Sequence, residues 1–485
     1  MSKRGNAVHI TTQRRHYTDK DGQEKVYETH LLRRSWRDGG KVRNETVANL
    51  SHLPSETIEL IRRSLAGERF IPATDGATVV RSLSHGHVAA VHALARGLGF
   101  PALLGPPGPE RDLAYALTIS RVIRPASTLS TAQWWEDVTL GPDLGVAGST
   151  AGDISAALGW LAARQDDIER QLADRHLHEG EIAMLDLSGC QVEGTHYELT
   201  ASGDSRDGKP SKPRIEYGLL TDKDSKPVAV QPFSYGTTGP KTFSRTVGTI
   251  RRKFGLATLI VAGDWRRITS ARIKELEQEA GTGWLTGLRY TAIERLTDGN
   301  GGLRLSHSDY HDLVATTSGD LPRRRLVAGR IEEPAQAGLW AATDGIYVIH
   351  TSVPAETLDA PGIIAAYEGL ANLERDFGRI EAEDLGRPAG GRRIDDRARA
   401  HMLICMLACY LTWHLRQAWA PLTSIEEHRP EQPMRSVRDI MDHLATLTRN
   451  DLRTRPATVS VLAEPTPGQR RAFELLGSPI PLTLT

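Results

Sequence analysis

The sequence of 485 residues predicts a mixed α/β fold for its central part. Three observations lead to this prediction: a short apolar strand, "EIAMLDLSG", that ends at Asp186; two alternating strands around a polar turn at 213–233; and an amphipathic helix at 241–255 that leads into a second apolar strand ending at Asp264. A helix, "SARIKELEQEAG", and a strand, "GWLTGLRY", follow. An antiparallel start followed by strand–helix–strand crossovers predicts a mixed sheet with helices packed against it.

The segments before this core follow two different patterns. Residues 8–50 alternate as strands do, with Asp-Gly and Gly-Gly turns between the runs, which predicts a small antiparallel meander. From about residue 55 to 175 the apolar spacing is helical, and Pro109 and Asp153 stand where helices begin. We interpret this part as a helical accessory region.

After the core the chain continues with an insertion without strong periodicity, a return strand "DGIYVIHTSV", two long helices, and a polar tail with one amphipathic helix. The predicted organisation is a β-meander at 1–54, a helical accessory region at 55–178, the first part of the core at 179–290, a reduced β-rich insertion with its return strand at 291–360, the C-terminal core helices at 361–425, and a tail at 426–485.

The composition is that of an ordinary globular protein. Sixty Lys and Arg balance sixty Asp and Glu, so the net charge argues neither for nor against a polyanionic partner. Three cysteines cannot form a disulfide framework, and the N-terminus has no apolar region typical of a signal peptide, so we expect a cytoplasmic protein. The most apolar run, at 402–415, is too short to cross a bilayer and predicts a core helix.

A third acid joins the two at the strand ends. Glu374 lies in the apolar stripe of a helix, four residues after Leu370 and seven after Tyr367, so it shares their face. If this helix packs across the sheet, Glu374 comes beside Asp186 and Asp264. Three clustered carboxylates repel one another unless a cation compensates, and Mg²⁺ or Mn²⁺ prefers such oxygen ligands. Two such ions about 4 Å apart stabilise the attacking and leaving oxygens in phosphodiester chemistry.

Each acid also has a plainer interpretation. A strand-end aspartate often only caps a loop, and Glu374 has the alternative of a salt bridge to Arg397 or Arg399 on the following helix. The combination of three acids with this order of strands favours a carboxylate triad on an RNase H-like sheet, which implies cutting or joining of nucleic-acid strands.

Several segments carry a family resemblance in the same order along most of residues 1–425. They are "AMLDLSGCQVEG", "GDSRDGKPSKPRIEYGLLTDKDSKPVAVQPF", "LIVAGDWRRITSARI", "DGIYVIHTSVPAE", "YEGLANLERDF" and "RARAHMLICMLACYLTWHLR". Together they resemble the DDE transposases of bacterial insertion sequences, in the sixteen-thirty-four-like group of the IS-four superfamily.

This resemblance implies a function for individual residues. Asp186, Asp264 and Glu374 match the catalytic, metal-binding acids, and Tyr367 matches the tyrosine of the family's tyrosine-to-glutamate helix signature. Such enzymes use Mg²⁺, bind the terminal inverted repeats of their element, and act as dimers or larger assemblies on double-stranded DNA. Water attacks the phosphodiester at the element end, and the freed 3′-hydroxyl then attacks target DNA.

The sequence also departs from the family pattern. Trp265-Arg266-Arg267 follows the second aspartate, where the group has arginine, glycine and methionine. Gly378 and Glu381 occupy positions where an arginine and a lysine are expected after the glutamate. Arg375 and Arg379 are candidate substitutes on another side of the helix. These changes leave the triad intact but affect DNA handling.

Further basic residues are candidates for contacts with the DNA backbone. They are Arg206 and Lys209 in the connector "GDSRDGKPSKPR", Arg323, Arg324 and Arg325 in "LPRRRLVAGR", Arg375, and Arg397. Tyr367 is a further candidate for contact with DNA. By elimination, we expect the meander and helices of residues 1–175 to recognise the element ends. Each segment has a plain alternative, a solvated loop for the connector and helix–sheet packing for Arg397. Trp265 either stacks on an unpaired base or packs in the core.

Two histidine clusters suggest zinc at first sight. His85, His87 and His92 lack a cysteine or carboxylate partner, and His401 shares a helical face with Cys405 and Cys409 among Leu, Ile and Met. Both clusters favour a place in the core.

Two other functions remain alternatives to an active transposase. One is a transposase-derived DNA-binding protein with lost or altered catalysis, which the departures motivate. The other is an RNase H-like nuclease that hydrolyses DNA without joining strands.

Overall fold

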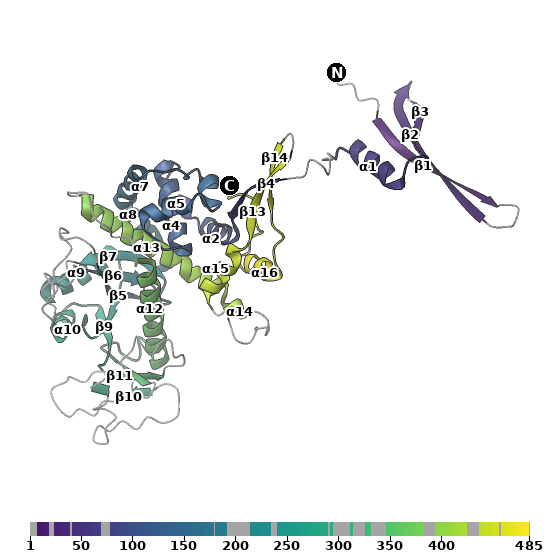
Figure 1. Cartoon of the computed structure of the whole chain (residues 1–485). Coiled ribbons are helices and arrows are strands. Elements are labelled where there is room, and N and C mark those ends of the chain that lie inside the picture. Colours follow the sequence, from purple (N-terminus) through teal and green to yellow (C-terminus); the bar gives the residue numbers. More distant parts are fainter. Residues whose placement is uncertain are drawn as a thin grey trace. The chain divides into compact units, whose positions relative to one another are not determined.

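The computed structural model describes residues 7–18, 24–38, 41–68, 78–178, 180–191, 214–233, 240–289, 292–293, 311–313, 325–330, 346–381, 393–423, 436–454 and 457–484. The chain forms two compact units. One comprises Met1–Val80 and Asp451–Val459, and the other comprises Arg81–Asn450 and Ser460–Thr485. Figure 1 labels their helices and strands.

The first unit contains the predicted meander. Strands β1 (Ala7–Thr18), β2 (Glu24–Asp38) and β3 (Lys41–Asn49) form an antiparallel sheet in the order β1-β2-β3. Helix α1 (Ser55–Leu65) belongs to the same unit. The predicted helical accessory region, which begins at residue 55, included this helix. Its residue Ile58 is buried, which shows that α1 supplies the small core of this unit.

The second unit begins with the predicted helical region. Pro109 is the first residue of its helix, and Thr150 and Asp153 form a capping box that starts another. The elements are β4 (Thr78–Ser84), which starts at the end of the first unit, α2 (Gly86–Gly97), α3 (Phe100–Leu104), α4 (Pro109–Ile123), α5 (Thr128–Trp134), α6 (Leu140–Leu144), α7 (Ala151–Ala163) and α8 (Gln165–His176).

A mixed sheet with flanking helices follows, as predicted. Its strand order is β10-β11-β12-β9-β8-β5-β6-β7, and β5, β8 and β9 run parallel while the others pair antiparallel. The strands are β5 (Ile182–Gln191), β6 (Arg214–Thr221), β7 (Pro227–Phe233), β8 (Thr258–Gly263), β9 (Thr282–Gly287), β10 (His311–Leu313), β11 (Arg325–Arg330) and β12 (Ile346–Thr351).

Helices cover both faces of this sheet. The helices are α9 (Pro240–Lys253), α10 (Ser270–Leu276), α12 (Ala360–Glu381) and α13 (Arg393–Ala418). Leu185 and Leu187 of β5 pack in the same apolar cluster as side chains of α9 and α10, whereas Met184 packs with α12. Successive side chains of a strand point to opposite faces, so Asp186 shares the α12 face with Met184. Figure 1 shows α9 and α10 on one side of these strands and α12 on the other.

Strand β5 is longer than predicted. It does not end at Asp186 but continues to Gln191, because residues beyond Asp186 pair antiparallel with β6. The parallel pairing with β8 does end at Asp186, which lies opposite Ala262.

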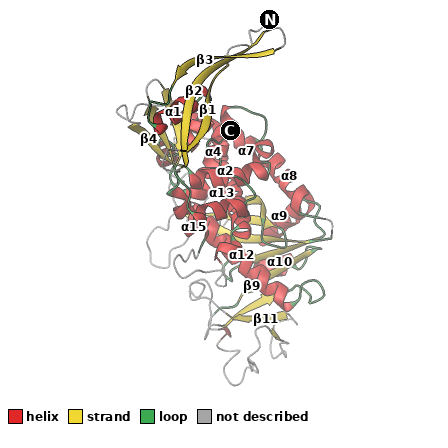
Figure 2. Ribbon diagram, turned by 90° about the vertical axis from the view of Figure 1, so that its right-hand side faces the viewer, coloured by secondary structure: helices red, strands yellow, loops and turns green. Residues whose placement is uncertain are grey.

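Helix α13 is the predicted core helix. Its residues from Met402 to Leu411 are buried, and the helix lies among α2, α4 and α7, as Figure 2 shows. No described helix is both long and apolar enough to cross a membrane.

The C-terminal segment contains more structure than the single helix predicted for it. The elements are α14 (Ala420–Thr423), α15 (Val437–Ala445), β13 (Thr448–Thr454), β14 (Ala457–Leu462) and α16 (Pro467–Leu475), and the two strands form a sheet in the order β14-β13-β4. Buried Phe473 and the hydrogen bond from Trp419 Nε1 to the Ala472 carbonyl (3.0 Å) join α16 to the end of α13. These contacts are tertiary and leave no periodicity in the local sequence.

Candidate active site

Two of the three predicted acids lie on adjacent parallel strands. Asp186 is in β5, and Asp264 directly follows β8, two residues after the Ala262 that pairs with Asp186. The strand order therefore places both acids toward the same end of the parallel pair. Helix α12, which carries Glu374, packs on the face to which Asp186 belongs.

Asp186 is a buried carboxylate in a negative environment. Its residue is only 4% exposed, and its Oδ2 atom has no hydrogen-bond partner among the described residues. Burial raises the pKa of Asp186 well above its usual value, and the charges of Glu374 and Asp264 raise it further, against the opposing effect of Arg267. Glu374 and Asp264 thus both lie within electrostatic reach of Asp186.

Glu374 is more exposed than its place in the apolar stripe predicts. Leu370 and Phe377 of that stripe are buried, whereas Glu374 lies where the helix surface opens to solvent. Its Oε1 accepts a hydrogen bond of 3.0 Å from the hydroxyl of Ser188. Arg399, one of the two alternative partners, acts on Asp166 instead, and the side chain of Arg397 lies outside the described residues.

Asp264 caps its own loop in this structure. Its Oδ1 accepts hydrogen bonds from the backbone amides of Arg266 and Arg267, both at 3.0 Å, and its Oδ2 lies 3.7 Å from Arg266 Nε. The side chain is 46% exposed, so water and solutes reach it. In this structure Asp264 therefore caps a loop, which is the alternative role given above for a strand-end aspartate.

The donor set fits a divalent metal in chemistry but is not assembled as a ligand cluster. Within the described residues, no group of three or more His, Cys, Asp or Glu side chains is arranged to hold a metal ion. Against this, a buried carboxylate oxygen without a hydrogen-bond partner is the group that a hard cation satisfies, and two further carboxylates act on it. Asp264 Oδ1 is engaged by the backbone amides of its own loop.

Arg267, which replaces the methionine of the family pattern, lies at this site. Its guanidinium passes over the backbone of Gly189 in β5, so closely that a side-chain carbon at Gly189 would lie 2.8 Å from Nη1. From there its charge lowers the pKa of Asp186 and opposes the two acids. Arg267 thus supplies positive charge beside Asp186, a role that the sequence pattern does not predict.

The neighbouring Trp265 packs between cations. The guanidinium carbons of Arg289 and Arg266 lie 3.8 Å and 5.3 Å from the centre of a Trp265 ring. In this structure its ring is therefore held by the two arginines.

Two tyrosines surround the acids. Tyr217 is fully buried, stacks on Phe377 with ring centres 4.7 Å apart, and has its pKa raised by burial. Burial also raises the pKa of Tyr367, whose hydroxyl lies against Gly287 at the end of β9. Any side chain at Gly287 would collide with that hydroxyl. Tyr367 therefore helps to set the position of α12 on the sheet, in addition to any contact with DNA.

The basic residues predicted to contact DNA differ in their surroundings. Arg325 donates to the carbonyls of Leu358 and Val353 and so connects β11 to the loop before α12. Arg375 Nη1 donates to Asn372 Oδ1 at 3.1 Å on its own helix. The remaining candidates, or their side chains, lie outside the described residues: Arg206, Lys209, Arg323, Arg324, Arg379 and Arg397. The side chain of Glu381, one of the departures from the family pattern, also lies outside them.

Both histidine clusters belong to the core, as the sequence favours. His85 Nδ1 lies 2.9 Å from Thr139 Oγ1, and His92 Nδ1 lies 3.1 Å from the Tyr115 hydroxyl. His401 Nε2 lies 3.5 Å from Cys405 Sγ inside α13, and all three side chains of that cluster are buried.

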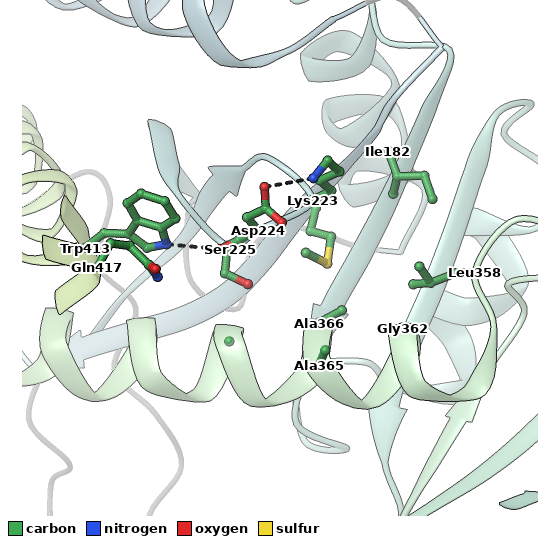
Figure 3. A pocket seen from close by; sticks show the side chains of 12 residues that line it. Ile182, Lys223, Asp224, Ser225, Leu358, Gly362, Ala365, Ala366, Trp413 and Gln417 are labelled. Carbon is green, nitrogen blue, oxygen red and sulfur yellow. Dashed lines mark hydrogen bonds and ion pairs between the residues drawn. The ribbon is translucent and has the colours of Figure 1, made fainter. Parts of the chain in front are cut away.

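A cavity of about 620 Å³ lies beside the acids without including them. Figure 3 shows it between the first half of α12, the turn between β6 and β7, and Trp413 and Gln417 of α13. Small residues of α12, among them Gly362, Ala366 and Gly369, leave this space open. None of the three acids lines this cavity.

Sequence reasoning did not identify Ser188. Its signal is weak, a serine two residues after Asp186, and only the packing of α12 brings it to Glu374, 186 positions further along the chain.

Residues 16–74 match the sequence profile "IS1634 family transposase, N-terminal domain". This match assigns the N-terminal part of the chain to the class of bacterial insertion-sequence transposases. It confirms the resemblance to such transposases that the sequence predicts.

Among solved structures, the piggyBac transposase synaptic complex with hairpin DNA is similar to this chain at 12% sequence identity and a TM-score of 0.33, over 74% of this chain and 76% of that one. No curated protein matches the chain.

Proposed function

We propose that this protein is a DNA transposase that cuts and joins the ends of a mobile element with an Asp-Asp-Glu triad formed by Asp186, Asp264 and Glu374. Two Mg²⁺ or Mn²⁺ ions are its cofactors. Its DNA partners are the terminal inverted repeats of the element and the target duplex, and it acts on them as a homodimer.

The order of the strands supports an RNase H-like core. The first strand of the region, β5, lies in the middle; the hairpin strands β6 and β7 extend from one side of it and the parallel strands β8 and β9 from the other. Strands β10, β11 and β12 add to the edge beyond β9, which is where a reduced β-rich insertion before α12 would lie.

The observation that carries the proposal is the state of Asp186. Asp186 is a buried carboxylate with a raised pKa, two acids act on it, and its Oδ2 has no hydrogen-bond partner among the described residues. Such a group is costly to keep without a compensating charge. Clusters of this kind are characteristic of functional sites rather than of ordinary cores. The N-terminal family match makes phosphoryl transfer on DNA the chemistry in question.

Each residue of the site has a separate task in this proposal. Asp186, Asp264 and Glu374 would hold the ions, which would supply charge stabilisation to the attacking and leaving oxygens of the phosphodiester. Ser188 orients the Glu374 carboxylate, and Asp264 turns its exposed carboxylate from the loop amides toward Asp186. Arg267 balances negative charge at the site before DNA is bound.

A cleavage assay tests the proposal. The substrate is a duplex carrying the inverted repeats that flank the coding region, incubated with Mg²⁺ or Mn²⁺. We expect nicking and transfer of the 3′-end into a second duplex by the wild type, and no chemistry with undiminished DNA binding by Asp186→Ala, Asp264→Ala and Glu374→Ala. Normal cutting by all three variants would refute the triad. Cutting without strand transfer would indicate a nuclease.

A second candidate is a transposase-derived DNA-binding protein that has lost catalysis. The engagement of Asp264 by its own loop amides, next to the altered residues 265–267, favours it. In that case the wild type binds the repeats but does not cut them at any Mg²⁺ or Mn²⁺ concentration, and restoring methionine at position 267 does not rescue cutting.

A further inference from the structure

The three-stranded sheet of the first unit has two chemically different faces. Residues directly opposite each other in neighbouring antiparallel strands point to the same side. Thr12 pairs with His30, and Arg62 of α1 reaches Thr12 Oγ1 at 3.5 Å, so this side faces α1 and is termed the helix-side face. Its neighbours in sequence, Thr11 and Gln13, therefore belong to the other side, the open face.

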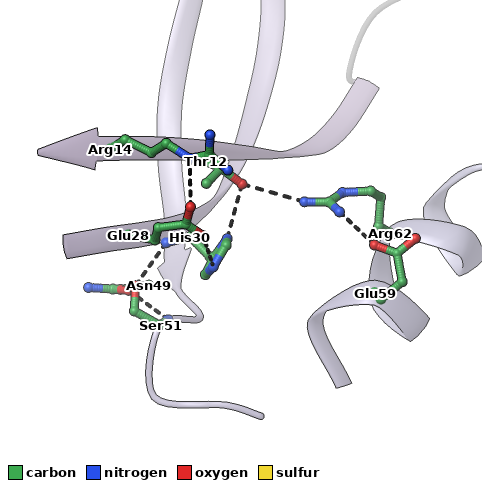
Figure 4. A network of polar contacts seen from close by, with 8 residues as sticks. All are labelled: Thr12, Arg14, Glu28, His30, Asn49, Ser51, Glu59 and Arg62. Carbon is green, nitrogen blue, oxygen red and sulfur yellow. Dashed lines mark hydrogen bonds and ion pairs between the residues drawn. The ribbon is translucent and has the colours of Figure 1, made fainter. Parts of the chain in front are cut away.

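The carboxylates of the sheet are on the helix-side face. Glu28 lies opposite Arg14 and forms an ion pair with it (2.6 Å), and Glu45 lies opposite Arg34. Figure 4 shows how Glu28, His30 and Thr12 connect through polar contacts toward Arg62. Charge on this face is therefore compensated within the protein.

The open face carries no carboxylate among the described side chains. The pairing Arg15–Tyr27, Gln13–Thr29, Arg33–Thr46 and Ser35–Asn44 places two arginines among amides, hydroxyls and an aromatic ring. Arg15 is exposed, and Tyr27 is 58% exposed. The Nε atom of Arg33 is shielded from solvent and has no hydrogen-bond partner within the part of the chain that the structure describes. This face is ready to accept a polyanion without repulsion from an acid.

The side chains and the dimensions fit duplex DNA. Arginine recognises guanine in the major groove, and glutamine and asparagine recognise adenine, while hydroxyls and tyrosine contact phosphates. The twelve residue pairs of β1 and β2 extend over roughly 40 Å at about 3.3 Å per residue. This length matches about one turn of B-DNA, whose major groove admits a β-ribbon.

We propose that the open face of the β1-β2-β3 sheet docks into a groove of duplex DNA and that Gln13, Arg15 and Arg33 contact base edges there. This proposal deepens the proposed function, because it names the surface that recognises the element ends. It rests on the proposed function in one respect, which is the choice of the inverted repeats as the DNA sequence that is bound.

Neighbouring arginines on opposite faces provide a matched test in the full-length protein. Arg15→Ala and Arg33→Ala change the open face, and Arg14→Ala and Arg34→Ala change the helix-side face by the same chemistry one residue away. Binding is measured by fluorescence anisotropy on a duplex with the flanking inverted repeats and on a scrambled duplex. We expect the open-face variants to lose roughly tenfold or more in affinity for the repeats, and the helix-side variants less than about threefold.

A conservative variant separates base contact from general charge. Arg15→Lys keeps the positive charge but loses the fork that binds guanine, so it should bind scrambled DNA as the wild type does while losing preference for the repeats. Circular dichroism checks that each variant is folded.

Equal losses on both faces, or wild-type binding by Arg15→Ala and Arg33→Ala, would overturn the proposal and direct attention to another surface. The cleavage result is independent: Asp186→Ala should bind the repeats normally. Failure of the triad with intact face dependence would therefore refute the proposed catalysis alone, and the reverse pattern would refute the docking face alone.

Discussion

The hydroxyl of Ser188 donates a hydrogen bond to Oε1 of Glu374 across 3.0 Å and so joins β5 to α12. Ser188 lies two residues after Asp186, on the same face of the same strand. Strand β5 therefore positions Asp186 directly and orients Glu374 through Ser188.

The first prediction concerns this bond. Ser188→Ala should lower the rate of cleavage about tenfold, because Glu374 loses the hydroxyl that fixes its carboxylate. A small displacement of a catalytic group is costly in rate. Ser188→Thr keeps the hydroxyl and should retain most of the activity. The measurement is single-turnover cleavage, and DNA affinity should not change in either variant. A rate unaffected by Ser188→Ala would show that the bond does not orient a catalytic group.

The second prediction concerns Arg267. Replacing it with methionine removes the charge that opposes the repulsion acting on Asp186. We expect Arg267→Met to lower the melting temperature by about 2–4 °C in EDTA, the shift that about 1 kcal/mol produces in a large domain. Mn²⁺ should raise the melting temperature of the variant more than that of the wild type, since the metal then supplies the missing positive charge. Equal shifts with Mn²⁺ would contradict this role.

The third prediction concerns a buried ion pair that supports the sheet. Arg272 of α10 binds both carboxylate oxygens of Glu216 in β6, at 2.7 Å and 2.8 Å, and its guanidinium lies 4.2 Å from the Phe243 ring centre. Arg272→Ala leaves a buried charge without a partner and should cost about 3–5 kcal/mol of unfolding free energy in denaturant titration.

The matched control is the exposed pair of Arg470 with Glu464 at 2.8 Å, where Arg470→Ala should cost less than about 1 kcal/mol. If Arg272→Ala costs as little as Arg470→Ala is expected to cost, the Glu216 pair does not support the sheet.

The fourth prediction is a pH dependence of stability. Burial lowers the pKa values of His87 and His92 to about 4 and that of His401 to about 3, from 6.5. The unfolded chain therefore binds more protons than the folded one below pH 6.5, and the melting temperature should fall as the pH decreases from 6.5 toward 4. His401→Leu should reduce this slope, and substitution of the exposed His52 should not. An unchanged slope in His401→Leu would contradict the assigned burial.

The sequence predicts the parts of the fold that depend on local pattern. Asp186 and Asp264 stand at the ends of apolar runs that are separated by a hairpin and one helix. Such a crossover can bring the two strands side by side in parallel, as the register of Asp186 with Ala262 shows. The alternation at 8–50 likewise predicts the meander.

Features that depend on tertiary contact are not predictable in this way. The extension of β5 to Gln191 comes from pairing with β6, and its residues Ser188–Gly189 carry no apolar pattern. The contact between Ser188 and Glu374 and the position of Arg267 over Gly189 arise only when distant elements pack together. Glu374 is also more exposed than Leu370 and Phe377, the neighbouring residues of its stripe, because one face of a helix of 22 residues is not uniformly buried.

The most direct measurement for the central claim is a metal-specificity switch. Asp186→Cys, Asp264→Cys and Glu374→Cys each replace a hard carboxylate with a thiolate, which Mn²⁺ accepts better than Mg²⁺. We predict that each variant is inactive in Mg²⁺ and recovers measurable cleavage of the inverted repeats in Mn²⁺, while the wild type cuts with both. Cleavage by the variants in Mg²⁺ at the wild-type rate, or no recovery in Mn²⁺ for any of the three, would contradict the claim that these carboxylates hold the ions.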